Sequence, residues 1–355
     1  ETIRKNMAKH NLPFSVIYKV TPETMFSGFD AYKHVIACDV DLIILTTPPV
    51  FRPIHFKAAV EAGKHVFIEK PIAVDPTGVK DVIKTSELAE KKGLTVVAGT
   101  QMRRARHIMA GMERLHDGAI GDLLSGQSTR IGGALSNWRQ SEAIRSNSWS
   151  DMEWQLRRWL FTTWASGDFI TEQHVHNLDL VDWLMGGHPI KAIGSGGRQN
   201  RTDLIYPNVW DHISVEYEYA NGARVTHIGS QIDGVSSRND LRVDGTEGRL
   251  FLSFAKDSIE GKNPFKYDGP HVNPAVQEYK DTLDAIRSGN TINEGKRIAQ
   301  STMTAILGRM AAYTGRNISW DWAMNASKLD LTPKDWSWHD YPLAPVAVPG
   351  KTKLI

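Results

Sequence analysis

The stretch that decides the fold is HVFIEKPIAV, residues 65–74. It opens with an apolar run, 65–68, that has the character of a buried β-strand, and it ends in Glu69, Lys70 and Pro71. On its own, such a tripeptide more often carries a solvated lysine. At the carboxyl end of a buried parallel strand, however, a lysine lies where ligands bind and can act as an acid, a base or a hydrogen-bond donor. Lys70 is therefore a candidate functional residue.

Strands and helices alternate in the first third of the chain. Strands are predicted within 40–49 (VDLIILTTPP), where the run 42–45 suits burial on both faces, within 65–71 and within 94–101. Helices are predicted after each strand, the second of them over 75–93 with Asp75 as its cap. This order predicts right-handed βαβ units and a parallel sheet. The strand ends read TTPP (46–49), EKP (69–71) and TQMRR (100–104), so special residues gather where a ligand is expected.

The pattern changes after residue 121. Residues 212–231 alternate on both sides of Asn221-Gly222, which predicts a hairpin, and residues 239–254 predict a shorter one. Two helices return within 274–315. We predict a fold that combines an α/β and an α+β part: a parallel-sheet domain over 1–121, a domain with a large open, mostly antiparallel sheet over 122–327, and a wrapping tail over 328–355.

The composition excludes several classes of protein. The chain has 355 residues, 41% hydrophobic and 23% charged, which indicates a globular protein with a sizeable core. A net charge of +2 gives no reason to expect a nucleic-acid partner, and no apolar run is long enough to predict a membrane span. The single cysteine, Cys38, excludes an internal disulfide and a thiolate metal cluster.

A second group of candidate residues lies in WASGDFITEQHVHNLDLVDWLMGG, residues 164–187. From Thr171 onward the segment predicts a helix, with Glu172 and His176 four apart on one face. A carboxylate one turn from a histidine can orient the ring and raise its basicity, which suits proton transfer to or from an alcohol. The plainer alternative is a pair on the helix surface. A metal site that includes His174 is weaker, because an H-x-H pair on a helix does not readily chelate one ion.

Arginines and tryptophans add weaker signals. Arg103 and Arg104 follow the third strand and could bind anionic or hydroxyl-rich groups, although such a pair is more often surface charge. Four tryptophans precede the histidine segment: Trp149, Trp154, Trp159 and Trp164. Stacking on a sugar ring is one interpretation, and packing in a core or lid is the commoner fate.

Together these segments resemble the Gfo/Idh/MocA oxidoreductases, the family of glucose–fructose oxidoreductase and inositol dehydrogenase. AGKHVFIEKP (62–71) is similar to the family signature that ends in Glu-Lys-Pro, and residues 46–66 resemble its cofactor loop and the following helix. MRR (102–104) resembles the segment where some members place a substrate-binding arginine. EQHVHNLD (172–179) is similar to the motif D-x-x-x-H-x-x-D, with Glu172 in place of the usual aspartate, which leaves its role open.

The resemblance implies hydride transfer between NAD or NADP, with NAD favoured, and a secondary hydroxyl of a sugar, glycoside or cyclitol, without a metal. Lys70 and His176 would contact the reacting hydroxyl, with the histidine as base, and Glu172 would orient it. The implied cofactor-binding residues are Thr46, Thr47, Pro48, Pro49, Glu69 and Lys70. The candidate substrate-binding residues are Arg103, Trp159 and His174.

One departure from the family pattern is large. Members begin with a strand, a G-x-G-x-x-G turn, a helix and a second strand that ends in an acid. None of these occurs here, and ETIRKNMAKHNL (1–12) reads like the middle of a helix. The dinucleotide-binding (Rossmann-like) domain is therefore expected to be N-terminally incomplete by roughly 50 residues. We expect an incomplete sequence rather than a natural protein that has lost its cofactor site.

Two other functions stay open. One is an NAD-dependent glycosidase that oxidises C3 transiently and eliminates the aglycone. The other is a non-catalytic sugar-binding or partner protein derived from a truncated dehydrogenase. Family members commonly dimerise or tetramerise through the open sheet, so a homo-oligomer is expected, with a sugar or cyclitol as ligand and no nucleic-acid or membrane partner. A cytoplasmic location is favoured, and export stays possible.

Overall fold

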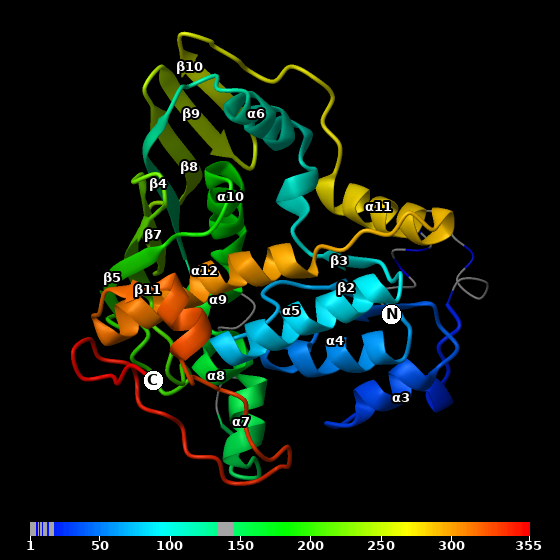
Figure 1. Cartoon of the computed structure of the whole chain (residues 1–355). Helices are drawn as coiled ribbons and strands as arrows, with labels where there is room; N and C mark the ends of the chain where they lie inside the picture. The colour runs from blue at the N-terminus through cyan, green and yellow to red at the C-terminus, as the bar shows by residue number, and fades with distance from the viewer. Residues whose placement is uncertain (1–4, 6, 8, 10–12, 14–17, 134–144) are drawn as a thin grey trace.

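A computed structural model describes residues 5, 7, 9, 13, 18–133 and 145–355. The helix predicted around residues 1–12 lies largely outside the described residues. Two sheets dominate the fold (Figure 1): a parallel one of three strands and a mixed one of eight. This arrangement confirms the predicted combination of an α/β and an α+β part, while the domain boundaries at 121 and 327 stay predictions. None of the described helices is long and apolar enough to cross a membrane.

The parallel sheet has the order β1-β2-β3. Its strands and helices are α3 (Ala31–Ala37), β1 (Leu42–Leu45), α4 (Arg52–Glu61), β2 (His65–Ile68), α5 (Pro76–Lys91) and β3 (Val96–Ala98). The predicted cap of α5 is confirmed, because Asp75 Oδ1 accepts a hydrogen bond of 2.7 Å from the Gly78 amide. The prediction that β1 is buried on both faces is wrong: Ile43 and Leu45 are buried, but Ile44 is 50% exposed, since the described residues cover one face of this strand.

The larger sheet has the order β10-β9-β8-β4-β7-β6-β5-β11. Its strands are β4 (Leu123–Gly132), β5 (Lys191–Gly197), β6 (His212–Glu218), β7 (Arg224–Gln231), β8 (Arg238–Gly245), β9 (Gly248–Ser253), β10 (Asp257–Gly261) and β11 (Ile318–Ser319). Both predicted hairpins form, β6 with β7 and β8 with β9, whereas β10 was not predicted. All neighbours are antiparallel except β4 and β7. The sheet is thus mostly antiparallel, as expected.

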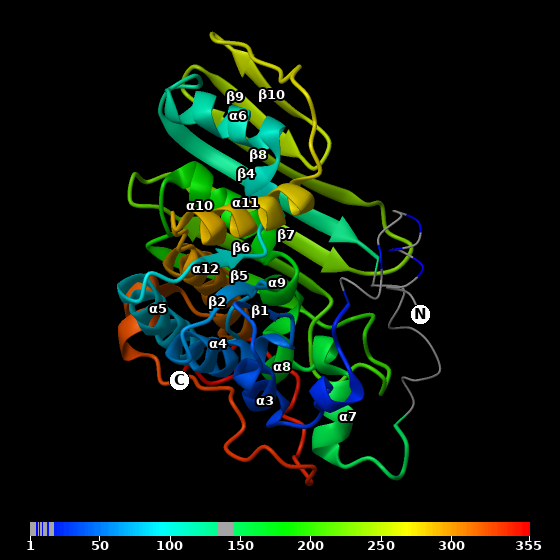
Figure 2. The same ribbon diagram turned by 90° about the vertical axis from the view of Figure 1, so that its right-hand side faces the viewer.

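Helices cover one face of the larger sheet and join it to the smaller one. They are α6 (Arg106–His116), α7 (Asp151–Arg157), α8 (Thr163–Ser166), α9 (Asp168–Glu172), α10 (Val175–Met185), α11 (Pro274–Ser288) and α12 (Gly295–Thr314). α12 is buried along most of its length and lies between the two sheets (Figure 2), packed on α5, α10 and β5. Such a helix, apolar on nearly all sides, belongs in the interior of a protein.

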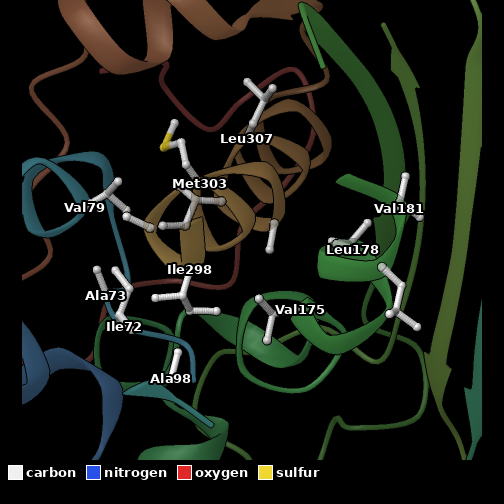
Figure 3. Close-up of a cluster of buried hydrophobic side chains, with 14 of the residues drawn as sticks. Ile72, Ala73, Val79, Ala98, Val175, Leu178, Val181, Ile298, Met303 and Leu307 are labelled. Atoms are coloured by element: carbon white, nitrogen blue, oxygen red, sulfur yellow. The ribbon is translucent and has the colours of Figure 1, made fainter. Parts of the chain in front are cut away.

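The side chains of α12 join both halves into one core. Figure 3 shows Ile298 and Met303 of α12 between Val79 of α5 on one side and Val175 and Leu178 of α10 on the other. All five are fully buried. Because interiors are packed as densely as organic crystals, this shared core holds the ends of the parallel strands at a fixed place relative to α10.

The tail that follows β11 contacts the start of α5, the segment after β1 and α8. Leu331 donates its amide hydrogen to Asp75 Oδ2 at 2.6 Å, at the start of α5. The ring of Trp336 packs on Phe51, with 4.7 Å between centroids, and on Phe29. The tail therefore fastens the first turn of α5 and the loop after β1 to the rest of the molecule.

A buried ion cluster also ties α10 to α12 and to the loop after β3. Asp179 on α10 is 1% exposed and accepts hydrogen bonds from Arg103 Nε at 2.7 Å, Arg297 Nη1 at 2.9 Å and Ser301 Oγ at 2.7 Å. Burial alone would raise the pKa of Asp179, but the two arginines and the hydrogen bonds lower it to about 2. The carboxylate is therefore ionised at neutral pH and contributes stability above its usual pKa.

Replacing Asp179 with asparagine should lower the free energy of unfolding by about 3 kcal/mol, because two partly buried arginines lose their partner. Urea unfolding at pH 7 measures this change. The matched control is Asp284→Asn, which breaks a surface pair with Lys280 whose side chains are 54% and 64% exposed. That change should cost less than about 0.5 kcal/mol. Equal effects of the two variants would contradict the role given to the cluster.

Candidate functional site

The predicted residues at the strand ends share one edge of the parallel sheet. Thr46 and Thr47 follow β1, and Glu69 and Lys70 follow β2. Thr46 is exposed, Thr47 is half-buried and its hydroxyl lies 3.2 Å from His55 Nδ1. Of the two prolines that follow, Pro48 is half-buried and Pro49 is buried. The edge therefore offers hydroxyl, carboxylate and ammonium groups side by side.

Gly99 makes room for the Glu69 carboxylate at the end of β3. A Cβ atom at this glycine would lie 2.5 Å from Glu69 Oε2, which is closer than atoms of a side chain can approach. The same oxygen accepts a hydrogen bond of 3.3 Å from the Lys70 amide. Glu69 is thus held against the neighbouring strand, and the Lys70 side chain is directed away from it.

The Lys70 side chain reaches the segment packed on the larger sheet. Its Nζ donates to the backbone carbonyl of Glu172 at 2.6 Å and lies 3.2 Å from Glu172 Oε1. Both side chains are 13% exposed, so the pair is partly shielded from water. The Lys70–Pro71 peptide bond is cis. Two residues predicted from separate motifs, 102 positions apart, therefore meet.

The prediction of a continuous helix from Thr171 is wrong. α9 ends at Glu172 and α10 begins at Val175. At the break, the His174 amide donates to the carbonyl of Phe169, five residues earlier, at 3.1 Å. The Glu172 carbonyl, which a continuous helix would use at residue 176, accepts from Lys70 instead. Lys70 thus binds the backbone carbonyl that the helix break leaves free.

His176 lies on the first turn of α10, and its ring is neutral. Burial, with smaller contributions from Lys70 and Arg130, lowers its pKa well below the ordinary value. Its Nδ1 is buried and has no hydrogen-bond partner in the described part of the chain. The described contacts include no hydrogen bond between the His176 ring and Glu172. The role of Glu172 in orienting the ring therefore stays a prediction. At neutral pH the ring is therefore uncharged, and one of its nitrogens can accept a hydrogen bond from a hydroxyl group.

His174 sits in a buried chain of polar groups. Its Nδ1 lies 2.9 Å from His227 Nε2, and His227 Nδ1 lies 3.0 Å from Ser128 Oγ. A Cβ atom at Gly229 would lie 2.4 Å from His174 Cε1, so glycine is required beside the ring. His174 is 0% exposed. In this conformation its contacts are with protein groups, and its role in binding a substrate stays a prediction.

The other two candidate substrate residues also contact protein groups. Arg103 directs its guanidinium at Asp179 and packs over the Trp183 ring, 4.7 Å from its centroid. Trp159 is half-buried and packs on two apolar clusters, one around Trp164 and one around Phe161. For Trp159 and Trp164, the interpretation as packing residues of the core fits the described contacts. The substrate roles of Arg103 and Trp159 stay predictions.

Sequence reasoning missed a set of polar side chains beneath the start of α10. They are Arg130 on β4, Gln173 and Asn177 on the helical segment, and Asn239 on β8. The partners are far apart in the sequence, and only the register of β4 against β7 and β8 brings them together. Strand alternation in STRIGG (128–133) could have placed Arg130 on the same face as Ser128, but not beside the histidine segment.

Because of its buried histidines, the free energy of unfolding of the protein should depend strongly on pH in the acid range. Burial lowers the pKa of His55 to about 4 and, together with Arg130, lowers the pKa of His227 to about 3, against an ordinary value of 6.5. As the pH falls below 6.5, the unfolded chain therefore takes up protons that the folded chain does not. The free energy of unfolding should fall by up to about 1.4 kcal/mol per pH unit for each such ring.

His227→Asn should reduce this slope between pH 6.5 and 4, because the variant has one proton fewer to take up on unfolding. Urea unfolding at several pH values measures the slope. The same variant at pH 8 is the control, since there the change reflects only lost hydrogen bonds. An unchanged slope would mean that His227 is protonated in the folded protein.

Two regions of the chain match known family descriptions. Residues 18–100 match "Oxidoreductase family, NAD-binding Rossmann fold", and residues 111–251 match "GFO/IDH/MocA C-terminal domain". Together these regions cover more than half of the 355 residues.

Known relatives and structures agree with these matches. A 2,7-anhydro-N-acetylneuraminate hydratase of Escherichia coli is 26% identical over 256 residues, 72% of this chain and 62% of the relative. A levoglucosan dehydrogenase of Pseudarthrobacter phenanthrenivorans is 24% identical over 241 residues, 61% of this chain and 56% of the relative. The chain thus spans less than two thirds of both relatives. The aldose-aldose oxidoreductase of Caulobacter crescentus, solved with glycerol, superposes with a TM-score of 0.67 at 18% identity, over 89% of this chain and 88% of that one.

Proposed function

Because the chain belongs to the Gfo/Idh/MocA oxidoreductase family, we propose that the protein transfers a hydride between NAD(P) and a secondary hydroxyl of a sugar, glycoside or cyclitol. The observation that carries the proposal is the contact of Lys70 with Glu172. It joins the carboxyl edge of the parallel sheet to the first turn of α10, where His176 lies. The similarity to a levoglucosan dehydrogenase supports this reaction and this substrate class.

The residues at the sheet edge fit a nicotinamide cofactor. A cavity of about 260 Å³ opens beside β1; its lining is mostly apolar and also includes Thr46, Thr47 and His55. Such a cavity suits part of a nucleotide, and Lys70 extends from the same edge toward α10. We propose that NAD, or NADP, lies along Thr46, Thr47, Pro48, Pro49, Glu69 and Lys70, and that no metal takes part. When bound, the cofactor supplies the acceptor or donor of the hydride.

The chain's own residues would handle the proton of the sugar hydroxyl. In the proposed arrangement, Lys70 Nζ donates a hydrogen bond to the hydroxyl oxygen, and the neutral ring of His176 accepts its proton as the carbon is oxidised. Glu172 keeps the lysine in place through its carbonyl and carboxylate. The partial burial of the pair strengthens these charged hydrogen bonds by excluding water.

Lys70→Ala and His176→Ala should each lower kcat by about 100-fold or more, because each removes a group that acts on the moving proton. The appearance of reduced nicotinamide with a panel of sugars and cyclitols measures turnover. Lys84→Ala and His271→Ala, at exposed positions, are the matched controls and should leave turnover unchanged. Unchanged turnover in both Lys70 and His176 variants would refute the proposed roles.

A second candidate reaction uses the same residues without net oxidation. The relative named a hydratase favours it, since addition or loss of water leaves the cofactor unchanged overall. The corresponding activity here would be that of an NAD-dependent glycosidase, with transient oxidation at C3 followed by elimination. An aryl glycoside separates the two reactions. Release of free phenol without accumulation of NADH supports the glycosidase, and accumulation of NADH without phenol supports the dehydrogenase.

We further propose that the protein forms a dimer or tetramer through the larger sheet. Its helix-free face carries apolar side chains such as Ile193, which is 48% exposed. The non-catalytic alternative predicts binding of sugar in calorimetry without turnover in any of these assays.

A further inference from the structure

Arg130 lies in the middle of β4, on the sheet face that looks toward α10. Its neighbours across the strands are Gly229 on β7 and Asn239 on β8. Strand alternation places it on the same face as Ser128, whose hydroxyl contacts His227 and so leads to His174. The space above Gly229 is taken by the His174 ring, so the buried histidines lie on that side of Arg130. Arg130 therefore lies beneath the chain segment that carries Glu172 and His176.

Arg130 lacks a carboxylate partner. Its one hydrogen bond within the described ranges runs from Nη1 to the neutral Oδ1 of Asn177, at 3.1 Å, and it forms no ion pair there. Asn177 is itself fixed, because its Nδ2 donates to Asn239 Oδ1 at 2.9 Å. Burial lowers the pKa of the Arg130 guanidinium below its usual range, and Glu172 opposes that shift. An arginine stays charged in proteins even so. A half-buried cation with a neutral partner is costly, and it leaves most of its donors free.

The charges around the site do not balance. Lys70, Arg52 and Arg130 are positive, and Glu69 and Glu172 are the carboxylates that act on them. Glu172 is engaged by Lys70. The neighbouring rings of His174, His176 and His227 have lowered pKa values through burial, so they are neutral. Asp179 is engaged by Arg103 and Arg297. Cations thus outnumber carboxylates in the described site, and the Arg130 guanidinium has no carboxylate within ion-pair distance there.

We infer that Arg130 binds a carboxylate of the substrate, so that the substrate is an acidic sugar such as a uronate or a sialate. A carboxylate matches the planar guanidinium fork and can accept two parallel hydrogen bonds. A carboxylate on the ligand would supply the anionic partner that the Arg130 guanidinium lacks within the described ranges. This inference rests on the proposed function, because Arg130 would hold the acid group of the sugar whose hydroxyl Lys70 and His176 contact.

The test compares acidic and neutral sugars in matched pairs: D-glucuronate with D-glucose, and N-acetylneuraminate with its methyl ester. The wild-type protein should favour one acid over its neutral partner in kcat/KM. Arg130→Met should remove that preference by raising KM for the acid about 100-fold, with little change for the neutral sugar. Arg130→Lys keeps the charge without the fork and should give an intermediate KM. The control Arg287→Met removes an exposed arginine from the last turn of α11 and should change neither value.

Equal kcat/KM for acids and neutral sugars in the wild type, or an equal loss for both in Arg130→Met, would overturn the inference and leave the proposed function standing. Calorimetric binding of the four sugars gives a readout that needs no turnover. Binding of an acid that is lost in Arg130→Met, without any hydride transfer, would support the carboxylate site and overturn the proposed function. If Arg130→Met fails to fold, as judged by urea unfolding, the same comparison with Arg130→Lys decides the question.

Discussion

The contact between Lys70 and Glu172 is the interaction on which the site depends. A lysine at the end of a parallel strand spans to a carbonyl at the end of α9 and to the carboxylate of the same residue. The carbonyl is available because the helix breaks there, and the break in turn places the first turn of α10, with His176, beside the lysine. Without the shared core around α12, which fixes the two sheets relative to each other, such a contact over a few ångströms would not persist.

Burial gives the site its electrostatic character. The histidine rings packed between the larger sheet and α10 are neutral because charging them would cost solvation that the interior does not replace. Neutral rings leave Lys70, Arg52 and Arg130 as the positive charges that act on Glu172. The burial that keeps His176 neutral therefore also leaves these cations as the main charges of the site, and the proposed binding of an acidic sugar depends on that.

The sequence predicted elements and strand ends well, because local patterns encode them. The alternation of strands and helices, the cap at Asp75 and the hairpin at Asn221-Gly222 follow from periodicity and turn chemistry. Lys70, Glu172 and His176 were found because strand ends and helical spacing point to them. The helix break was not, because it depends on a lysine 102 residues away. Arg130 was missed because its surroundings come from strand register between β4, β7 and β8, which one sequence does not reveal.

The central claim is that a hydride passes from a sugar carbon to NAD(P) beside Lys70, Glu172 and His176, which handle the proton of the hydroxyl. The most direct measurement is transfer of deuterium from a sugar deuterated at its secondary carbinol carbons to NAD, followed by mass spectrometry of the recovered cofactor and sugar. The account predicts deuterium in the nicotinamide, or its loss from the sugar where oxidation is transient, and neither in Lys70→Ala. A sugar that binds and is recovered with its full deuterium content, beside an unlabelled cofactor, would contradict it.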